Sequence, residues 1–189
     1  RGLRVDDAAA VERAVAAAGA EQPVRVCAYH FPPYVMKPES NAPEGLLPEL
    51  LAAFNAAQDQ YRFDLVPTSV TRRYRDLQQA RYDMILFESP DWGWQNIPLQ
   101  KLDQQITDAE VYVARAGEGR DQHYFDRLDN KRMALYSGYH YGFAGFNADQ
   151  EYLGRQFNAV LTYSHDSNLL MVQADRADIA LVTRSYLSD

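Results

Sequence analysis

A glutamate and a histidine in this sequence are of the types that carry out acid–base chemistry. Glu88 directly follows an apolar run, and His140 follows a second one after a short glycine-containing stretch. A carboxylate in that place could accept hydrogen bonds from an ammonium or hydroxyl group. With an imidazole it could also form a general acid–base pair. A surface carboxylate or an ion pair with Arg72 explains Glu88 equally well, so its residue type leaves these roles open.

Arginines and aromatic residues are the other groups with binding potential. Arg72 or Arg73 could bind a carboxylate, and one of the two is expected to be only a solvated charge. The chain has 13 Tyr and 8 Phe, which could stack on a flat ligand or enclose a cation. Phe87 is better explained as sheet packing. Residues 139–141 follow an apolar run and a glycine. If a helix begins there, its free amide groups would bind an anion, but an ordinary turn explains the segment equally well.

Several kinds of site are not expected from this sequence. The four histidines and Cys27 lack metal-ligand spacing, and neither a Gly-x-Ser-x-Gly motif nor a glycine-rich phosphate loop occurs, so we expect no metal and no cofactor. With 19 basic and 26 acidic side chains, the net charge of −7 argues against nucleic acid or an anionic membrane as partner. No stretch approaches the ~20 apolar residues of a membrane span.

The elements that must position these residues alternate between helix and strand. Helices are predicted over 6–18, 46–57 and 74–80, and strands over 24–29, 63–66 and 83–87. In the second helix, Leu46, Leu47, Leu50, Leu51 and Phe54 have the spacing of one buried face. Such alternation predicts α/β units with mostly parallel sheets flanked by helices.

The pattern repeats later in the chain. Comparing 63–86 with 158–181 without a gap aligns Ser69 with Ser164, Gln78 with Gln173, Arg81 with Arg176, Asp83 with Asp178, and Leu86 with Leu181. The strand at 25–29 likewise corresponds to 132–136. We interpret this as two similar lobes, although any two strand–helix–strand units share such a layout.

The predicted domain boundaries follow from this repeat. They are an N-terminal helix at 1–20, lobe 1 at 21–110, lobe 2 at 111–183, and the start of a return crossover to lobe 1 at 184–189, with the remainder apparently absent. The extended apolar segment 109–115 between the lobes is the predicted hinge strand.

In order and spacing, six segments resemble the extracellular solute-binding proteins of family 3, over about residues 24–187. They read RVCAYHFPPY (25–34), GLLPELLAAF (45–54), LQQARYDMI (77–85), ITDAEVYVAR (106–115), RMALYSG (132–138) and VQADRADIA (172–180). The resemblance implies the two-lobed type II periplasmic binding fold, with a ligand cleft between the lobes. It also implies a periplasmic or extracellular location, with a signal peptide removed.

The sequence departs from the amino-acid binders of that family at two places. They carry an Arg after the third strand for the ligand's carboxylate, whereas 88–95 contains none. They carry an Asp after the lobe-two Arg-x-Asp strand for the amino group, whereas the matching position here is Thr183, followed by Arg184. The ligand is therefore not identified by the resemblance.

Candidate ligand-binding residues follow from position, because ligands of open parallel sheets bind beyond the carboxyl ends of the strands. The candidates are Tyr29, Phe31, Tyr34, Ser69, Arg72, Arg73, Glu88, Ser89, Trp92, Trp94, Gly138, Tyr139, His140, Tyr141, Thr183 and Arg184.

The predicted function is capture of a small polar or amino-acid-like solute by lobe closure, and its presentation to an ABC-type transporter permease. One alternative is the ligand-sensing input domain of a membrane signalling protein. Another is an enzyme on the same fold, dehydratase-like or associated with a lytic transglycosylase, with Glu88 and His140 as acid and base. A third is an interaction module that binds no solute.

Overall fold

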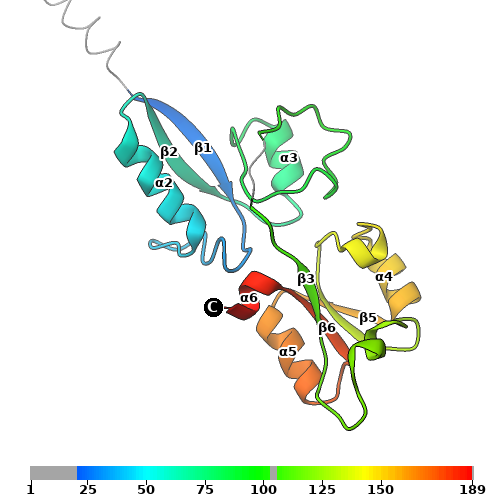
Figure 1. Ribbon diagram of the computed structural model, residues 1–189. Helices are drawn as coiled ribbons and strands as arrows, with labels where there is room; N and C mark the ends of the chain where they lie inside the picture. The colour runs from blue at the N-terminus through cyan, green and yellow to red at the C-terminus, as the bar shows by residue number, and fades with distance from the viewer. Residues whose placement is uncertain (1–20, 103–105, 189) are drawn as a thin grey trace, which may run out of the picture. The chain divides into compact units, whose positions relative to one another are not determined.

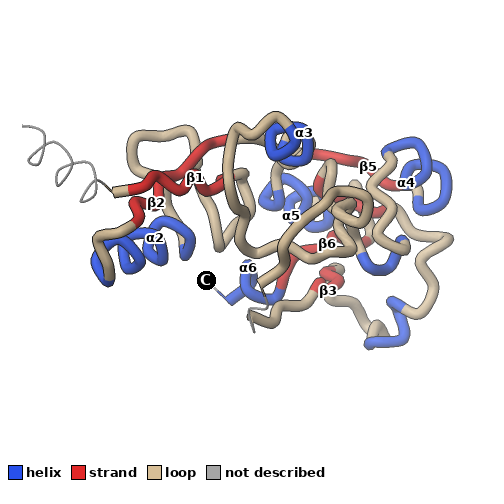
Figure 2. Tube along the Cα trace, turned by 90° about the horizontal axis from the view of Figure 1, so that it is seen from above, coloured by secondary structure: helices blue, strands red, loops and turns tan. Residues whose placement is uncertain are grey.

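The computed structural model describes residues 21–102 and 106–188, so the helix predicted at 6–18 lies outside the described residues. By its internal contacts the chain divides between Leu86 and Phe87 into two compact units, which we call unit 1 and unit 2. Both units combine parallel strands with helices (Figures 1 and 2). The lobe boundaries drawn from the sequence stay a prediction.

Unit 1 is built on two parallel strands. β1 (Gln22–Ala28) pairs with β2 (Tyr61–Pro67), and α2 (Leu46–Ala57) connects them. The sequence predicted all three elements, and the bounds of α2 are those expected. In β1 the last three residues are buried, as befits a strand that enters the core.

The apolar face of α2 is narrower than predicted. Leu47 and Leu51, one helical turn apart, are buried, and Leu50 and Phe54 are half-buried beside them. Leu46 was expected on the same face but is 37% exposed. Adjacent helical residues point about 100° apart, so Leu46 cannot share the direction of Leu47.

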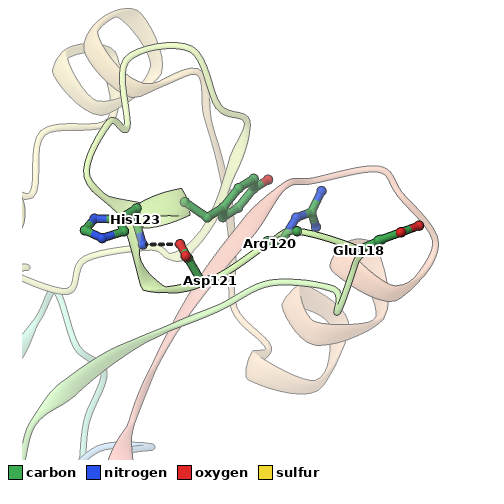
Figure 3. A pocket seen from close by; sticks show the side chains of 6 residues that line it. Glu118, Arg120, Asp121 and His123 are labelled. Atoms are coloured by element: carbon green, nitrogen blue, oxygen red, sulfur yellow. Dashed lines mark hydrogen bonds between the residues drawn. The ribbon is translucent and has the colours of Figure 1, made fainter.

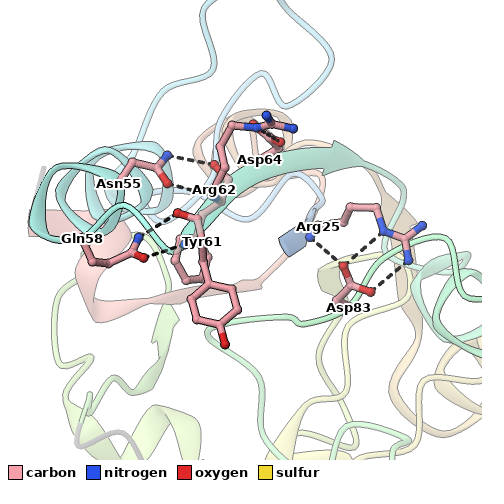
Figure 4. A network of polar contacts seen from close by, with 8 residues as sticks. Arg25, Asn55, Gln58, Tyr61, Arg62, Asp64 and Asp83 are labelled. Atoms are coloured by element: carbon pink, nitrogen blue, oxygen red, sulfur yellow. Dashed lines mark hydrogen bonds and ion pairs between the residues drawn. The ribbon is translucent and has the colours of Figure 1, made fainter. Parts of the chain in front are cut away.

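Two amide side chains join α2 to β2 (Figure 4). Asn55 donates from Nδ2 to the Phe63 carbonyl at 3.0 Å and accepts from the Phe63 N–H at 2.8 Å. Gln58 makes the same two bonds with Tyr61, at 2.8 and 2.7 Å. These carboxamides satisfy backbone groups along β2 that would otherwise need water or another strand.

The strand predicted at 83–87 is wrong. Only Met84 makes a parallel bridge, with Val26, and no strand forms over the segment. Before it, α3 (Arg73–Gln78) takes the place of the helix predicted at 74–80.

Unit 2 contains a four-stranded sheet in the order β3-β6-β4-β5. Its strands are β3 (Glu110–Val113), β4 (Met133–Tyr136), β5 (Ala159–Thr162) and β6 (Ile179–Thr183). Only β3 is antiparallel to its neighbour, and the other pairs are parallel. The strand expected at 109–115 is therefore confirmed as β3, whereas its role as a hinge stays a prediction.

Helices lie between these strands or follow the last of them. They are α4 (Gln150–Phe157), α5 (His165–Gln173) and α6 (Arg184–Ser188), with two short 3₁₀ helices, η1 (Gln122–Phe125) and η2 (Gly142–Ala144). None of the described helices is long and apolar enough to cross a membrane.

The sheet of unit 2 has an apolar cluster on each face. Met133 and Leu135 of β4 pack in one cluster with Leu153 of α4. Ala134, between them, packs in the other with Val172 of α5. Side chains alternate across a strand, so α4 and α5 cover opposite faces.

The repeat inferred from the sequence has the same hydrogen bonds in both units. Asp83 accepts from the Arg25 backbone N at 2.8 Å, from Nε at 3.2 Å and from Nη2 at 2.9 Å. Asp178 accepts from the same atoms of Arg132 at 2.7, 3.1 and 3.1 Å. We call this arrangement the Arg–Asp clasp. It joins an arginine within β1 or directly before β4 to the segment that follows the last helix of each repeat.

The helix ends match as well. Ala80 and Asp175, 95 positions apart in the sequence, both have positive φ, at 54° and 60°. Each follows the C-cap of its helix. The repeat is thus present in backbone conformation as well as in residue type.

Candidate functional site

The carboxyl ends of β1 and β2 form one edge of unit 1, because the two strands are parallel. Three aromatic candidates that follow β1 pack against one another there. The rings of Tyr29 and Phe31 stack at 5.8 Å, and those of Phe31 and Tyr34 lie 5.1 Å apart. All three are under 8% exposed. In this conformation they support the edge and present little surface to a solute.

The two adjacent arginines differ sharply in environment. Arg73 is 1% exposed, with its guanidinium 4.7 Å from the Tyr29 ring centroid and 4.5 Å from that of Tyr74. It also donates to the Val70 carbonyl. Arg73 is therefore part of the core of unit 1, with its charge over aromatic faces.

Arg72 is exposed at the same edge of unit 1. Its backbone N and its Nε both donate to Ser69 Oγ, at 3.1 and 3.2 Å. Within the part of the chain that the structure describes, its terminal amino groups make no hydrogen bond or ion pair. The candidates Ser69 and Arg72 thus come together as a hydroxyl and an oriented guanidinium.

The segment after Leu86 carries the candidates Glu88, Ser89, Trp92 and Trp94. Glu88 accepts a hydrogen bond from Trp94 Nε1 at 2.9 Å, and Trp94 is 3% exposed. Ser89 Oγ accepts from the Asp91 backbone N at 3.3 Å. Part of the acceptor capacity of Glu88 therefore positions a buried indole, a role that the sequence did not suggest.

In unit 2 the turn after β4 differs from the expected anion site. Tyr141 is 3% exposed, and its hydroxyl accepts from the Tyr136 backbone N at 2.9 Å. Burial raises the pKa of Tyr141 far above its usual value. Tyr141 is a core residue here, with no face open to a ligand.

The backbone amide of Gly142, the first residue of η2, donates to a carboxylate of the same chain. Gly142 N lies 3.0 Å from Glu110 Oε2 and 3.3 Å from Oε1. Burial raises the pKa of Glu110, and the Gly142 N–H partly offsets this. The sequence left two interpretations open here, an anion site or a simple turn, and the structure shows that the Gly142 amide already has Glu110 as its acceptor.

A group of aromatic side chains meets at the carboxyl ends of β4 and β5. Gly138, in the turn after β4, has a φ of 87°, which suits glycine. The rings of Tyr136 and Tyr139 stack at 4.4 Å. His165, the first residue of α5, lies 4.7 Å from the Tyr136 ring and 5.1 Å from that of Tyr186. We call Tyr136, Tyr139, His165 and Tyr186 the Tyr–His cluster.

Of this cluster, the sequence predicted only Tyr139 as a ligand-binding residue. Its neighbour His140, also predicted, is half-buried. Ligand-binding residues are expected directly after strands, and residues 163–165 directly follow β5. In the repeat they correspond to residues 68–70. Comparing the two halves would therefore have pointed to His165.

The last candidates lie where β6 meets α6. Thr183 Oγ1 accepts from the Tyr186 backbone N at 3.3 Å and lies 3.0 Å from Ser185 Oγ. Arg184 is exposed. Its guanidinium makes no hydrogen bond or ion pair to any residue within 21–102 or 106–188. Thr183 thus orders the helix start, and Arg184 is open to solvent.

A shallow depression of about 360 Å³ lies elsewhere in unit 2 (Figure 3). It is lined by Glu118, Gly119, Arg120, Asp121, His123 and Tyr124. β3 runs antiparallel, so the segment that follows it lies at the sheet edge opposite to the carboxyl ends of the parallel strands. Asp121 caps η1 there through the His123 backbone N at 2.9 Å. We do not take this depression as the ligand site.

The described residues include no group of three or more His, Cys, Asp or Glu side chains that could hold a metal ion. The polar groups at the two strand-end edges are hydroxyls, guanidinia and a histidine, which suit recognition of a polar organic molecule.

No protein-family model matches the sequence, and no curated protein matches it either. Solved structures do resemble the fold. The periplasmic VFT2 domain of Bordetella pertussis BvgS has a TM-score of 0.61 at 20% identity, over 95% of this chain and 73% of that chain. An ABC uptake transporter substrate binding protein from Streptococcus pneumoniae with bound histidine has a TM-score of 0.64 at 17% identity, over 88% and 68%.

A third similar structure is the ancestral amino acid-binding protein AncCDT-1, described as a precursor of cyclohexadienyl dehydratase. It has a TM-score of 0.62 at 12% identity, over 95% of this chain and 77% of that chain. At such identities the similarity shows the fold alone. The chain has the two-lobed α/β fold of type II periplasmic binding proteins, as the sequence predicted.

Proposed function

We propose that this chain is an extracytoplasmic solute-binding module that captures a small polar or amino-acid-like molecule and presents it to an ABC-type transporter. The observation that carries the proposal is the type II binding fold together with polar side chains at the carboxyl ends of its strands. In this fold the loops after the strands are the places where ligand-binding residues gather. Several similar structures are named as amino-acid or transporter binding proteins.

Arg72 is the side chain that we assign to an acidic group of the solute. It is exposed, its Nε is oriented by Ser69, and its terminal amino groups have no partner among the described residues. A guanidinium held in this way can bind a carboxylate through two parallel hydrogen bonds. It would thus take the place of the Arg that the family's amino-acid binders carry after the third strand.

In the proposed mechanism the solute first binds the exposed residues at the strand ends. Tyr139 contributes a hydroxyl and Arg72 a charge, and closure about the segment 109–115 then encloses the solute. The closed form is what a membrane partner would recognise, because a ligand shifts the population toward the state that it binds better.

The test is a thermal-shift screen of the whole chain against amino acids, polyamines, quaternary amines, small acids and sugars. A solute at a hundredfold excess over its Kd should stabilise the chain by about 2.7 kcal/mol. For a hit with an acidic group, Arg72→Ala should weaken binding about 10- to 100-fold, since a hydrogen-bonded charge contributes about 1.5–3 kcal/mol.

Arg75→Ala is the matched control, because Arg75 is exposed on α3, the helix that begins directly after Arg72. It should leave the affinity unchanged. No stabilisation by any solute would contradict the binding role, and equal affinities of both variants would contradict the assignment of Arg72.

A sensing role is the second candidate, since one similar structure is a periplasmic VFT2 domain rather than a transporter's binding protein. A membrane span encoded beside these residues in the same reading frame would favour sensing. Catalysis is the third, since AncCDT-1 is named as the precursor of a dehydratase. Turnover of a bound solute that Glu88→Gln abolishes would establish it.

A further inference from the structure

The outer edge of β2, which faces away from β1, carries backbone groups at which another strand can pair. Among the described residues, β1 is the one strand that pairs with β2. The Gln60 carbonyl and the Thr68 N–H bond to β1, at 3.0 and 2.9 Å. Peptide groups of successive residues point to opposite edges of a strand, so those of Tyr61, Phe63 and Leu65 point outward.

Two carboxamides from the end of α2 already use these outward groups (Figure 4). Asn55 bonds to the N–H and the carbonyl of Phe63, at 2.8 and 3.0 Å. Gln58 bonds to the N–H and the carbonyl of Tyr61, at 2.7 and 2.8 Å. A carboxamide has a donor and an acceptor side by side, and so can replace the peptide groups of a further strand. Gln58 also donates to the Phe54 carbonyl at 3.1 Å, which ties the last turn of α2 to the edge.

The residues of this edge are complementary to themselves. When two copies of β2 run antiparallel with Phe63 opposite Phe63, Tyr61 lies opposite Leu65 of the second copy, and each such pair exchanges two backbone hydrogen bonds. The same register places Arg62 opposite Asp64 of the second copy. Both side chains are about half exposed, and within one chain they form an ion pair at 2.9 Å. Opposite charges that face each other across strands are attractive, so the charges favour this pairing.

We propose that Asn55 and Gln58 keep this chain from pairing through β2 with a second copy of itself, by holding the last turn of α2 on the edge. An open edge strand is a template for another strand, and proteins cover such edges. The partner that fits is a second copy, because pairing about a two-fold axis uses the same surface on both molecules and the β2 edge is complementary to itself. This inference does not depend on the proposed function.

The experiment is size-exclusion chromatography with light scattering on the whole chain at several protein concentrations. The double variant Asn55→Ala with Gln58→Ala should open the edge, because alanine side chains make no hydrogen bonds. We expect it to self-associate at least about tenfold more tightly than the parent chain, since the backbone groups of Tyr61 and Phe63 become available to a second copy. A folded double variant that associates no more than the parent chain would overturn the proposal.

Asn130→Ala with Gln156→Ala is the matched control, because it removes the same two types of side chain from exposed positions. Within the described part of the chain, neither side chain bonds to a strand. This variant should associate as the parent chain does. If the variant of Asn55 and Gln58 does not fold, the two single variants decide, because each frees one residue of the edge and keeps the other bonded. Increased association in neither of them would also overturn the proposal.

Charge exchange identifies the surface through which the copies associate. Asp64→Arg added to the double variant places Arg62 opposite an arginine of the second copy, and like charges directly opposite each other are destabilising. Association should then return to the level of the parent chain. A further Arg62→Asp exchange restores opposite charges and should restore association. Association that responds to neither exchange would show that the copies meet at another surface, and would overturn the proposal.

Discussion

At the scale of single residues, charged side chains in this protein differ in whether folding favours their ionised form. Asp178 and Asp83 each accept three hydrogen bonds from an arginine, and these bonds hold their pKa values below the usual range. The Glu110 carboxylate has one backbone N–H as its donor, and desolvation raises its pKa instead. A charged guanidinium offsets the desolvation of the two aspartates, whereas Glu110 has only a neutral backbone N–H to offset its own.

Removing the charge of Asp178 should therefore destabilise unit 2. We expect Asp178→Asn to lower the free energy of unfolding at pH 7 by about 1 kcal/mol, since the clasp is partly solvated. A lowered carboxyl pKa stabilises the fold above the unfolded-chain value near 3.9, and that contribution is lost as the pH falls through the folded-state pKa. Denaturant melts between pH 7 and the acid range should thus show a flatter profile for the variant.

Asp129→Asn is its control, because Asp129 forms only an exposed ion pair with Arg127. Its stability should match that of the parent chain. An equal loss in both variants would mean that the clasp is no more stabilising than a surface ion pair.

Glu110 should behave in the opposite way. A raised carboxyl pKa favours the fold at low pH, and this advantage is lost as the pH rises through the folded-state pKa. Glu110→Gln keeps an acceptor for Gly142 N without a partly desolvated charge, so we expect equal or greater stability at pH 7. Glu110→Ala leaves that N–H without its acceptor and should cost about 1 kcal/mol. A Gln variant less stable than the Ala variant would contradict this account.

At the scale of elements, each repeat ends its last helix with a residue in the left-handed region. Ala80 after α3 has a φ of 54°, and Asp175 after α5 has a φ of 60°. Glycine is the residue that adopts this conformation without steric cost. In both repeats the clasp aspartate, Asp83 or Asp178, follows this residue by three positions, so the same turn leads into the clasp although the residue types do not favour it.

Replacing Ala80 by glycine should therefore stabilise unit 1. We expect Ala80→Gly to raise the free energy of unfolding by about 1 kcal/mol, since the left-handed conformation costs about that much for a residue with a Cβ. Ala53→Gly, at an exposed position inside α2, should instead cost about 0.5–1 kcal/mol. Thermal melts of the two variants should move in opposite directions. A shared direction would show that the strain at Ala80 is absent in solution.

At the scale of the whole molecule, each compact unit has buried apolar residues of its own. Leu47 of α2 is 1% exposed in unit 1, and Leu135 of β4 is fully buried in unit 2. Units with separate cores can open separately, because local stability follows the contacts that each unit buries.

We expect Leu135→Ala to cost about 2–5 kcal/mol and to raise hydrogen exchange mainly in unit 2. Leu47→Ala should raise exchange mainly in unit 1. The measurement is native-state hydrogen exchange read by mass spectrometry of peptides from both units. Uniform loss of protection across both units in each variant would show that the chain unfolds as one cooperative body.

The sequence by itself determined the fold class, the helix α2 and the repeat. These depend on patterns along the chain, namely apolar spacing, helix–strand alternation and the paired Arg and Asp positions. Such patterns restrict each segment to one kind of element before any distant segment is considered.

The tertiary structure decided which side chains the strand-end edges expose. It buried Arg73 and left Arg72 exposed, it placed Glu110 on the Gly142 amide, and it joined His165 to Tyr139. It also replaced the strand predicted at 83–87 with a single bridge. Each of these outcomes depends on how segments distant in the chain approach one another, and neither residue type nor local spacing encodes that approach.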